Sequence, residues 1–263
     1  MNDTNRSTFI FDTLAESTPG IRAVRTQPTT ALPTLRGVLQ KFSPLPHEAL
    51  FLGVADDGLP VLLNLRDPVP GPVLITGDSK SGKTKFLQII ARTIGQSHNP
   101  ENIRFTVLTD KRTGWESMDQ SANCEGILSF DHPLTTKYLN SLVDWAHNNK
   151  HEKQFILLLV DGLEALMADE DIHQIFRWLL LRGPARRIWP IVTLNAQHSQ
   201  DARQWLESFR TRLFGRMAGV RDVQYLTGST NDLLRELVPG SQFTMRESKD
   251  WLSFWLPKLD EEA

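Results

Sequence analysis

The chain has 263 residues, 40% of them hydrophobic, which suits one large domain or one domain with an appendage. Its formal net charge of −2 gives no overall positive charge that would favour nucleic acid or a membrane surface. The single cysteine, Cys124, excludes an internal disulfide, and no apolar run is long enough to cross a membrane, so we expect a cytoplasmic location, with which a membrane-anchored partner is compatible.

The N-terminal residues 1–45 differ in composition from the rest of the chain. Serine, threonine and proline recur there, most densely over residues 26–34, which is typical of a linker. An apolar cluster within residues 9–14 either packs on its own domain or docks on a partner. We therefore expect an N-terminal arm over residues 1–45 and one domain over residues 46–263.

A hairpin is expected where this domain begins. The apolar segments 49–54 and 59–65 flank Asp56-Asp57-Gly58, which is a turn signal. Downstream of the hairpin, residues 72–76 form a short apolar run of the kind that makes a buried parallel strand.

Residues 77–84 read Gly-Asp-Ser-Lys-Ser-Gly-Lys-Thr and match the phosphate-binding pattern G-x-x-x-x-G-K-[ST]. In this pattern the loop amides form a nest for an anion, the lysine reaches the β- and γ-phosphates, and the last hydroxyl ligates Mg²⁺. The alternative is a chance match in a surface turn, but the preceding strand and the helical spacing that follows are the context that the motif requires. The candidate nucleotide-binding residues are Gly77, Asp78, Ser79, Lys80, Ser81, Gly82, Lys83 and Thr84.

Strands and helices alternate through the middle of the chain. Residues 103–109 and 126–130 are expected strands, and residues 135–147 are an expected helix. This alternation predicts an α/β fold with a mostly parallel sheet covered by helices on both faces.

Residues 155–161 form an apolar run that ends in Asp161, as in a buried strand that delivers a carboxylate to Mg²⁺. The alternative is a core strand whose aspartate only caps the next turn. Many ring ATPases carry a glutamate directly after this aspartate, whereas Gly162 stands here, so Glu164 is the nearest carboxylate for activating water. Glu164 either replaces that base or faces solvent, in which case hydrolysis is slow or a neighbouring subunit completes the site.

The segment 191–197 is a third strand with a polar end. Asn195 or Gln197 at this end would sense the γ-phosphate or hold the attacking water. The alternative is an ordinary amide at the edge of the sheet.

Taken together, these segments resemble the FtsK/SpoIIIE–HerA group of ring ATPases over residues 48–247. The resemblance rests on the phosphate loop, on the strand ending in Asp161, and on more diffuse matches at residues 52–61, 108–112, 195–198, 209–217 and 237–243. The Asp161-Gly162 pair is similar to some ATPase modules of the type VII secretion motors EccC and EssC. An additional strand between the two motifs also places the chain in the RecA-like (ASCE) branch of P-loop NTPases.

The resemblance implies a motor that uses ATP and Mg²⁺ and moves DNA or a secreted polypeptide. It also implies a hexameric ring of identical or related subunits, in which an arginine of each subunit completes the neighbouring site. Arg186 and Arg212 match the arginines of the group best. The expected catalytic residues are Lys83, Asp161, Glu164, Gln197, Arg186 and Arg212, with Thr84 and Asp161 as metal ligands. The alternative function is a low-turnover ATP-binding module for assembly or regulation.

Overall fold

The computed structural model describes residues 32–149, 153–167, 170–247 and 250–260. Their strands fall into two groups. Parallel pairing joins β3 (Val73–Gly77), β4 (Ile103–Leu108), β5 (Cys124–Leu128), β6 (Phe155–Val160), β7 (Ile188–Asn195) and β8 (Thr211–Phe214). Antiparallel pairing joins β1 (Ala49–Ala55), β2 (Pro60–Asn64), β9 (Gln242–Glu247) and β10 (Asp250–Trp255).

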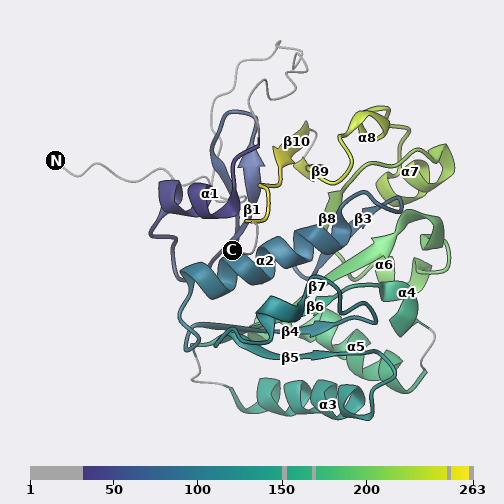
Figure 1. The fold of residues 1–263 in the computed structure, drawn as a ribbon. Helices are drawn as coiled ribbons and strands as arrows, with labels where there is room; N and C mark the ends of the chain where they lie inside the picture. The colour runs from purple at the N-terminus through teal and green to yellow at the C-terminus, as the bar shows by residue number, and fades with distance from the viewer. Residues whose placement is uncertain (1–31, 150–152, 168–169, 248–249, 261–263) are drawn as a thin grey trace.

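All these strands belong to one ten-stranded sheet, in the order β2-β1-β10-β9-β8-β3-β7-β6-β4-β5 (Figure 1). The antiparallel strands extend the parallel part beyond β8, where β9 pairs antiparallel with it. The expected α/β class with a mostly parallel sheet is confirmed.

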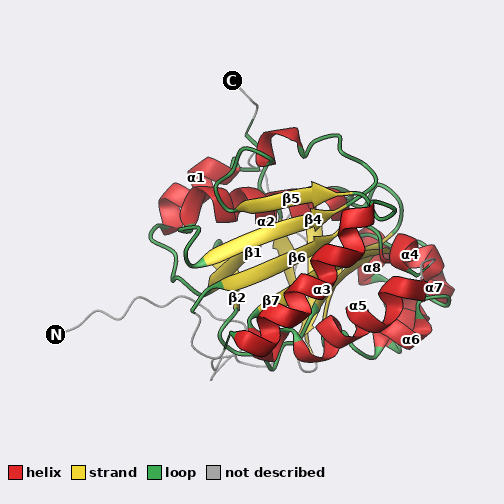
Figure 2. Cartoon of the chain, turned by 90° about the horizontal axis from the view of Figure 1, so that it is seen from below, coloured by secondary structure: helices red, strands yellow, loops and turns green. Residues whose placement is uncertain are grey.

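Helices cover both faces of the sheet (Figures 1 and 2). One face carries α1 (Leu35–Phe42) and α2 (Lys83–Ser97). The other carries α3 (Pro133–Asn148) and α5 (Glu170–Arg182). Shorter helices follow the strand ends on this second side: α4 (Leu163–Leu166), α6 (Arg203–Leu206), α7 (Val220–Thr227) and α8 (Leu233–Glu236).

The sheet separates two hydrophobic cores, and β6 shows why its sequence is apolar throughout. Side chains of a strand alternate between the two faces. Phe155, Leu157 and Leu159 enter the core under α1 and α2. The alternate residues of the strand enter the core under α3 and α5, so every position of β6 is buried. A strand covered on both faces reads as a continuous apolar run.

The expected hairpin is confirmed: β1 and β2 pair antiparallel, and Gly58 in their turn has a φ of +81°. The strand expected to begin at residue 191 begins at Ile188. Pro190 therefore lies within β7, where it is paired with Leu158. A proline inside a central strand is unusual, and for this reason the sequence pattern placed the boundary after it.

The expected N-terminal arm over residues 1–45 contains α1, which begins directly after the linker-like segment 26–34. Thr34 caps this helix by accepting a hydrogen bond from the Gly37 N–H at 3.2 Å, and its apolar face is buried in the first core. Sparse apolar residues at helical spacing, rather than the abundance of threonine and proline, were the informative signal here. The apolar cluster within residues 9–14 lies outside the described residues.

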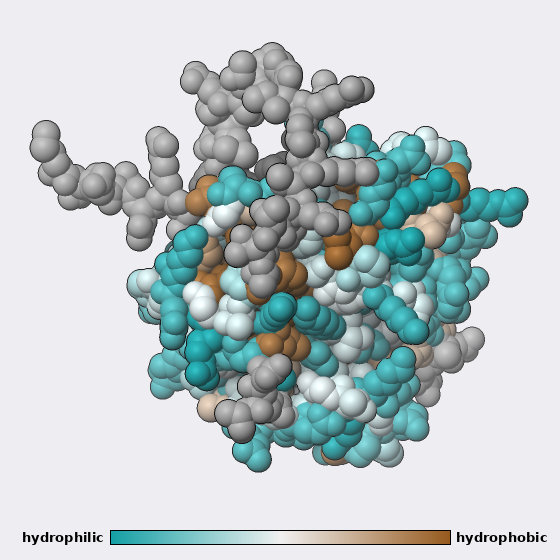
Figure 3. Space-filling view, turned by 45° about the horizontal axis from the view of Figure 1, so that its top comes forward, coloured by the Kyte–Doolittle hydropathy of each residue, from teal (hydrophilic) through white to brown (hydrophobic). Residues whose placement is uncertain are grey.

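The face of the molecule in Figure 3 is mainly hydrophilic, with small hydrophobic patches. Within the described part of the chain, no helix combines the length and the apolar character needed to cross a bilayer.

Candidate nucleotide-binding site

The phosphate loop joins the end of β3 to the start of α2, and its two glycines are required by close packing. Gly82 has a φ of +101°, and a Cβ there would lie 2.7 Å from the Cα of Gly240. A Cβ on Gly77 would lie 2.6 Å from the Oγ of Ser81. Both contacts are shorter than a real Cβ tolerates, so only glycine allows this loop shape.

The loop is held from outside by two neighbouring segments. The Asp78 N–H donates to the carbonyl of Arg216 at 2.9 Å, and the Gly240 N–H donates to the carbonyl of Ser81, also at 2.9 Å. The Asp78 carboxylate accepts a hydrogen bond from the Ala218 N–H at 2.8 Å. Asp78 thus anchors the loop, whereas the expectation gave it a direct part in nucleotide binding.

Residues of the phosphate loop and of the first turn of α2 line one pocket at the N-terminus of this helix. The first N–H groups of a helix have no partner within it and bear a partial positive charge, which suits a phosphate. Ser79, Lys80, Lys83 and Thr84 line a pocket of about 320 Å³ at this end of the helix. Lys80 adopts a left-handed backbone with a φ of +63°, which is uncommon for a residue with a side chain.

Lys83 lies at the mouth of the loop. Its Nζ donates to the carbonyls of Gly77 at 2.9 Å and Asp78 at 2.8 Å. Burial lowers the pKa of Lys83, and the negative charges of Glu164 and Asp161 oppose that effect. An ammonium group has three donors, so one remains to reach an anion in the pocket.

Thr84, Asp161 and Thr193 come together from three elements at the carboxyl ends of the strands. The Thr84 hydroxyl lies 3.0 and 2.9 Å from the two carboxylate oxygens of Asp161. The Thr193 hydroxyl donates to Asp161 Oδ1 at 3.1 Å. Burial raises the pKa of Asp161, and these two hydrogen bonds act in the opposite direction.

This arrangement fits a hard divalent cation. Mg²⁺ prefers oxygen ligands and is usually held by one or two protein groups, with phosphate oxygens and waters completing the octahedron. Thr84 and Asp161 supply those groups beside the phosphate loop. No cluster of three histidine, cysteine or acidic side chains suited to a metal occurs in the described ranges, so a metal here would depend on the nucleotide for further ligands.

Thr193 was not among the expected site residues. It is a polar residue inside an otherwise apolar strand, and β7 pairs it with Ile75 of β3. A single buried threonine in a strand next to the phosphate loop is the signal that would have identified it.

Glu164 enters the same pocket from the first turn of α4. Its Oε2 is buried and has no hydrogen-bond partner among the described residues. The preceding Gly162 has a φ of +125° and a ψ of 87°, a conformation that L side chains rarely adopt. The backbone itself therefore disfavours glutamate at position 162, and Glu164, two residues further on, places a carboxylate in the pocket.

At the end of β7 the structure separates the two candidate amides. Asn195 lines the pocket, and its Oδ1 caps the following turn by accepting from the Gln197 N–H at 3.4 Å. Gln197 is exposed and does not line the pocket, and its amide lies 3.2 Å from His198 Nε2. The strand ends at Asn195, one of the two amides considered for the strand end, and this amide lines the pocket.

Neither candidate arginine lines the pocket of its own chain. Arg186 is exposed in the turn before β7, at the opposite end of that strand from Asn195. The Arg212 guanidinium donates to the carbonyls of Phe209 at 3.2 Å, Leu226 at 3.0 Å and Leu206 at 2.6 Å. Arg212 is thus bound within its own chain, a role that no local sequence pattern indicates.

One cation that was not expected does line the pocket. Lys111 follows β4, in a turn closed by a hydrogen bond from its N–H to Thr109 Oγ1 at 3.1 Å. Its charge acts on both ionisable groups of the site, since it lowers the pKa of Asp161 and the pKa of Lys83.

Comparisons with known proteins give the fold of this chain but no close relative. No family model and no curated protein sequence matches it. Among solved structures, the cytoplasmic domain of the type VII secretion ATPase EccC of Thermomonospora curvata matches with a TM-score of 0.71 and 14% identity. That match covers 89% of this chain and 33% of the EccC chain, so the protein spans about a third of that relative.

Two further structures come from other transport systems. The pCW3 conjugation coupling protein TcpA, solved with ATPγS, matches with a TM-score of 0.65 and 17% identity, covering 88% of this chain and 70% of that one. The genome-packaging NTPase B204 of Sulfolobus turreted icosahedral virus 2, solved with AMP, matches with a TM-score of 0.52 and 10% identity. That match covers 73% of this chain and 100% of the viral chain. The chain therefore has the P-loop ATPase fold found in EccC, in TcpA and in this packaging NTPase.

Proposed function

We propose that this protein binds ATP with Mg²⁺ and hydrolyses it. The observation that carries this proposal is the contact of Thr84 with Asp161 at 2.9–3.0 Å, directly beside Lys83 and the phosphate loop. In this arrangement the loop amides and Lys83 bind the phosphates, and Thr84 and Asp161 hold the metal. Mg²⁺ held by Thr84 and Asp161 would supply charge neutralisation at the β- and γ-phosphates.

Glu164 is the proposed base. Its Oε2 is buried and has no hydrogen-bond donor among the described residues, so this oxygen is available to a water molecule, while the negative charge of Glu164 also acts on Lys83. A carboxylate in that state within the pocket can orient a water molecule and accept its proton. Asn195, on the neighbouring strand end, is the proposed amide that positions this water or contacts the γ-phosphate, in place of Gln197.

Ring formation and transport of DNA or a secreted polypeptide are further proposals. They are supported by the roles of the structural neighbours, which serve secretion, conjugation and genome packaging. A ring of identical or related subunits needs a cation that reaches the neighbouring site. Arg186 suits this part better than Arg212, because Arg186 is exposed whereas Arg212 is bound by three carbonyls. A membrane-anchored partner would tether such a ring.

A second candidate function is a module that binds ATP and turns it over slowly, for assembly or regulation. Gly162 favours it, because the position after the metal-binding aspartate has a backbone suited to glycine and offers no carboxylate. The two functions share a nucleotide site and differ in rate.

Steady-state ATP hydrolysis by the purified protein, with and without DNA, separates the two functions. We expect Mg²⁺-dependent turnover that disappears in Lys83→Ala, because each lost charge-assisted phosphate contact costs roughly 1.5–3 kcal/mol. Lys137→Ala, an exposed lysine on α3, is the matched control. Tight ATP binding without turnover in the wild type would favour the regulatory module. Unchanged ATP affinity in Lys83→Ala would refute the site itself.

A further inference from the structure

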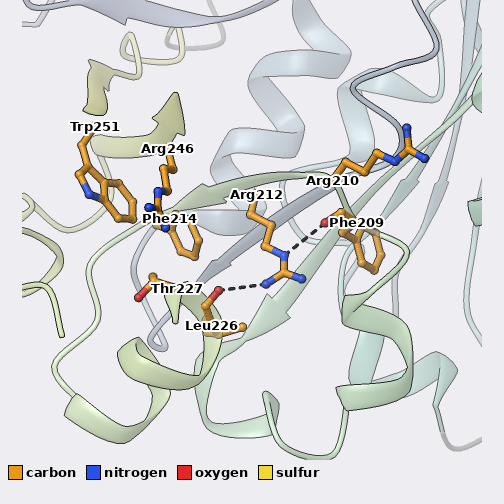
Figure 4. A pocket seen from close by; sticks show the side chains of 8 residues that line it. All are labelled: Phe209, Arg210, Arg212, Phe214, Leu226, Thr227, Arg246 and Trp251. Atoms are coloured by element: carbon orange, nitrogen blue, oxygen red, sulfur yellow. Dashed lines mark hydrogen bonds between the residues drawn. The ribbon is translucent and has the colours of Figure 1, made fainter. Parts of the chain in front are cut away.

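A second pocket lies away from the nucleotide site, between β8, the β9–β10 hairpin and the end of α7 (Figure 4). Its volume is about 340 Å³, which is close to that of the nucleotide pocket. Arginines and aromatic rings line it, and the backbone of α7 closes one side. Nothing in the proposed ATPase mechanism uses these side chains.

Two arginines of neighbouring strands line this pocket. β8 and β9 pair antiparallel at Leu213–Met245 and Phe214–Thr244, and Arg212 and Arg246 are the next residues of the two strands beyond the Leu213–Met245 pair. In the described ranges no carboxylate forms an ion pair with either arginine. Among the described residues the lining of the pocket therefore carries a net positive charge, which an anionic ligand would balance.

The two arginines have different parts in the pocket. Arg212 is half-buried and fixed by the three carbonyls described above, so it contributes charge from a rigid position. Arg246 is exposed, and Figure 4 shows its side chain beside those of Trp251 and Phe214. The guanidinium of Arg246 is thus the group that can form a new bidentate contact with a carboxylate.

Aromatic rings supply the apolar wall. The rings of Phe214 and Trp251 lie 5.6 Å apart in an edge-to-face arrangement. Trp251 pairs with Arg246 across β9 and β10, so a ring and a charge are adjacent on the same face. An anionic ligand that fills this pocket would also carry an apolar or aromatic part.

We propose that this pocket binds an acidic, aromatic-containing peptide segment of a polypeptide partner, with one carboxylate on Arg246 and an apolar side chain against Trp251 and Phe214. The volume suits one or two side chains. A nucleic acid would instead need a run of cations that follows successive phosphates. The next arginine, Arg210, does not continue such a run, because Figure 4 shows its side chain directed away from Arg212 and it contacts the carbonyl of Val69 at 3.5 Å.

The test is a binding assay on the full chain without nucleotide, so its outcome does not depend on whether the protein hydrolyses ATP. The probe is a fluorescein-labelled peptide, Ac-Gly-Glu-Phe-Glu-Phe-Gly, and its neutral counterpart carries glutamine in place of each glutamate. We expect saturable binding of the acidic peptide and binding at least about tenfold weaker for the neutral one, because the charge-assisted contact is lost.

Variants connect the binding to the pocket. Arg246→Glu should lower the affinity for the acidic peptide by about tenfold or more. A probe with lysine in place of each glutamate should bind this variant better than it binds the wild type. The matched control, Arg203→Glu, reverses an exposed arginine of α6 outside the pocket and should leave affinity unchanged. The charge-swapped probe keeps the test decisive if Arg246→Glu alters local packing.

Three outcomes would overturn the proposal. The first is no binding of the acidic peptide up to about 1 mM, the weak limit of useful affinity. The second is equal loss of affinity in Arg203→Glu, which would indicate a general charge effect. The third is competition by an oligothymidylate of about 20 nucleotides that depends on Arg246, which would make the pocket a nucleic-acid site.

Discussion

Replacing Glu164 by glutamine removes the charge of its carboxylate and keeps nearly the same shape. In the structure this carboxylate is the only acidic side chain that α4 brings into the nucleotide pocket, and its Oε2 has no donor among the described residues. This oxygen is therefore available to a water molecule. General-base contributions are typically about 10²–10⁴-fold, so we expect turnover to fall by about a hundredfold or more. A hundredfold corresponds to about 2.7 kcal/mol of transition-state free energy.

ATP binding should change far less than turnover in this variant. The negative charge of Glu164 raises the pKa of Lys83, so removing that charge lowers the pKa of Lys83. The same removal takes a negative charge away from the phosphates and favours their binding. These two effects oppose each other, and we expect the dissociation constant of ATP to stay within about tenfold of the wild type, or 1.4 kcal/mol.

Single-turnover hydrolysis of γ-labelled ATP, together with equilibrium binding of ATP, measures both quantities. Glu207→Gln, an exposed carboxylate after α6, is the matched control and should leave both unchanged. A fast wild type whose turnover is unaffected by Glu164→Gln would refute Glu164 as the base and indicate a group from a neighbouring subunit. A wild type that binds ATP with background turnover would support the regulatory module.

Three further predictions concern the metal end of the site. Thr193→Val removes one donor from Asp161 and should raise the Mg²⁺ concentration for half-maximal turnover by several-fold, since one hydrogen bond contributes about 0.5–1.5 kcal/mol; an unchanged Mg²⁺ titration would contradict this. Asp161→Asn should abolish Mg²⁺-dependent turnover yet raise the melting temperature without nucleotide at neutral pH. Because folding raises the pKa of Asp161, the folded chain holds the extra proton between the unfolded and folded pKa values, and stability falls as pH rises through that window. The gain from Asp161→Asn should therefore shrink as pH is lowered toward the pKa of folded Asp161, and a constant gain would count against this cause. Gly162→Glu should destabilise the protein by roughly 1–3 kcal/mol without raising turnover, because its φ of +125° suits only glycine; a faster enzyme would show that the backbone adapts.

The phosphate loop and the strand that ends in Asp161 could be identified from the sequence because each is a contiguous pattern. Residues 77–84 combine glycines, a lysine and a threonine at spacings that one loop conformation requires, and β6 is apolar at every position because both of its faces are covered. The hairpin and most core elements were predicted for the same reason, since their signals are local turns and periodicity.

Strands β9 and β10 of the antiparallel extension were not predicted from the pattern of their residues. β9 and β10 mix polar and apolar residues, and they take their place by pairing with β8 and with β1, far away in the sequence. Helix α1 is similar, because its eight residues become stable only when Leu35, Val38 and Leu39 pack on α2 and the sheet. A helix this short gains most of its stability from tertiary contacts.

Local pattern predicts a nucleotide site at Lys83, Thr84 and Asp161, because each of these residues belongs to a contiguous motif. Only the tertiary structure decided what else faces that site. The register of β7 places Thr193 on Asp161 and ends the strand at Asn195. Strand register and helix packing are set by contacts between residues far apart in the chain, and a one-residue shift turns a side chain to the other face, so no local pattern carries that information.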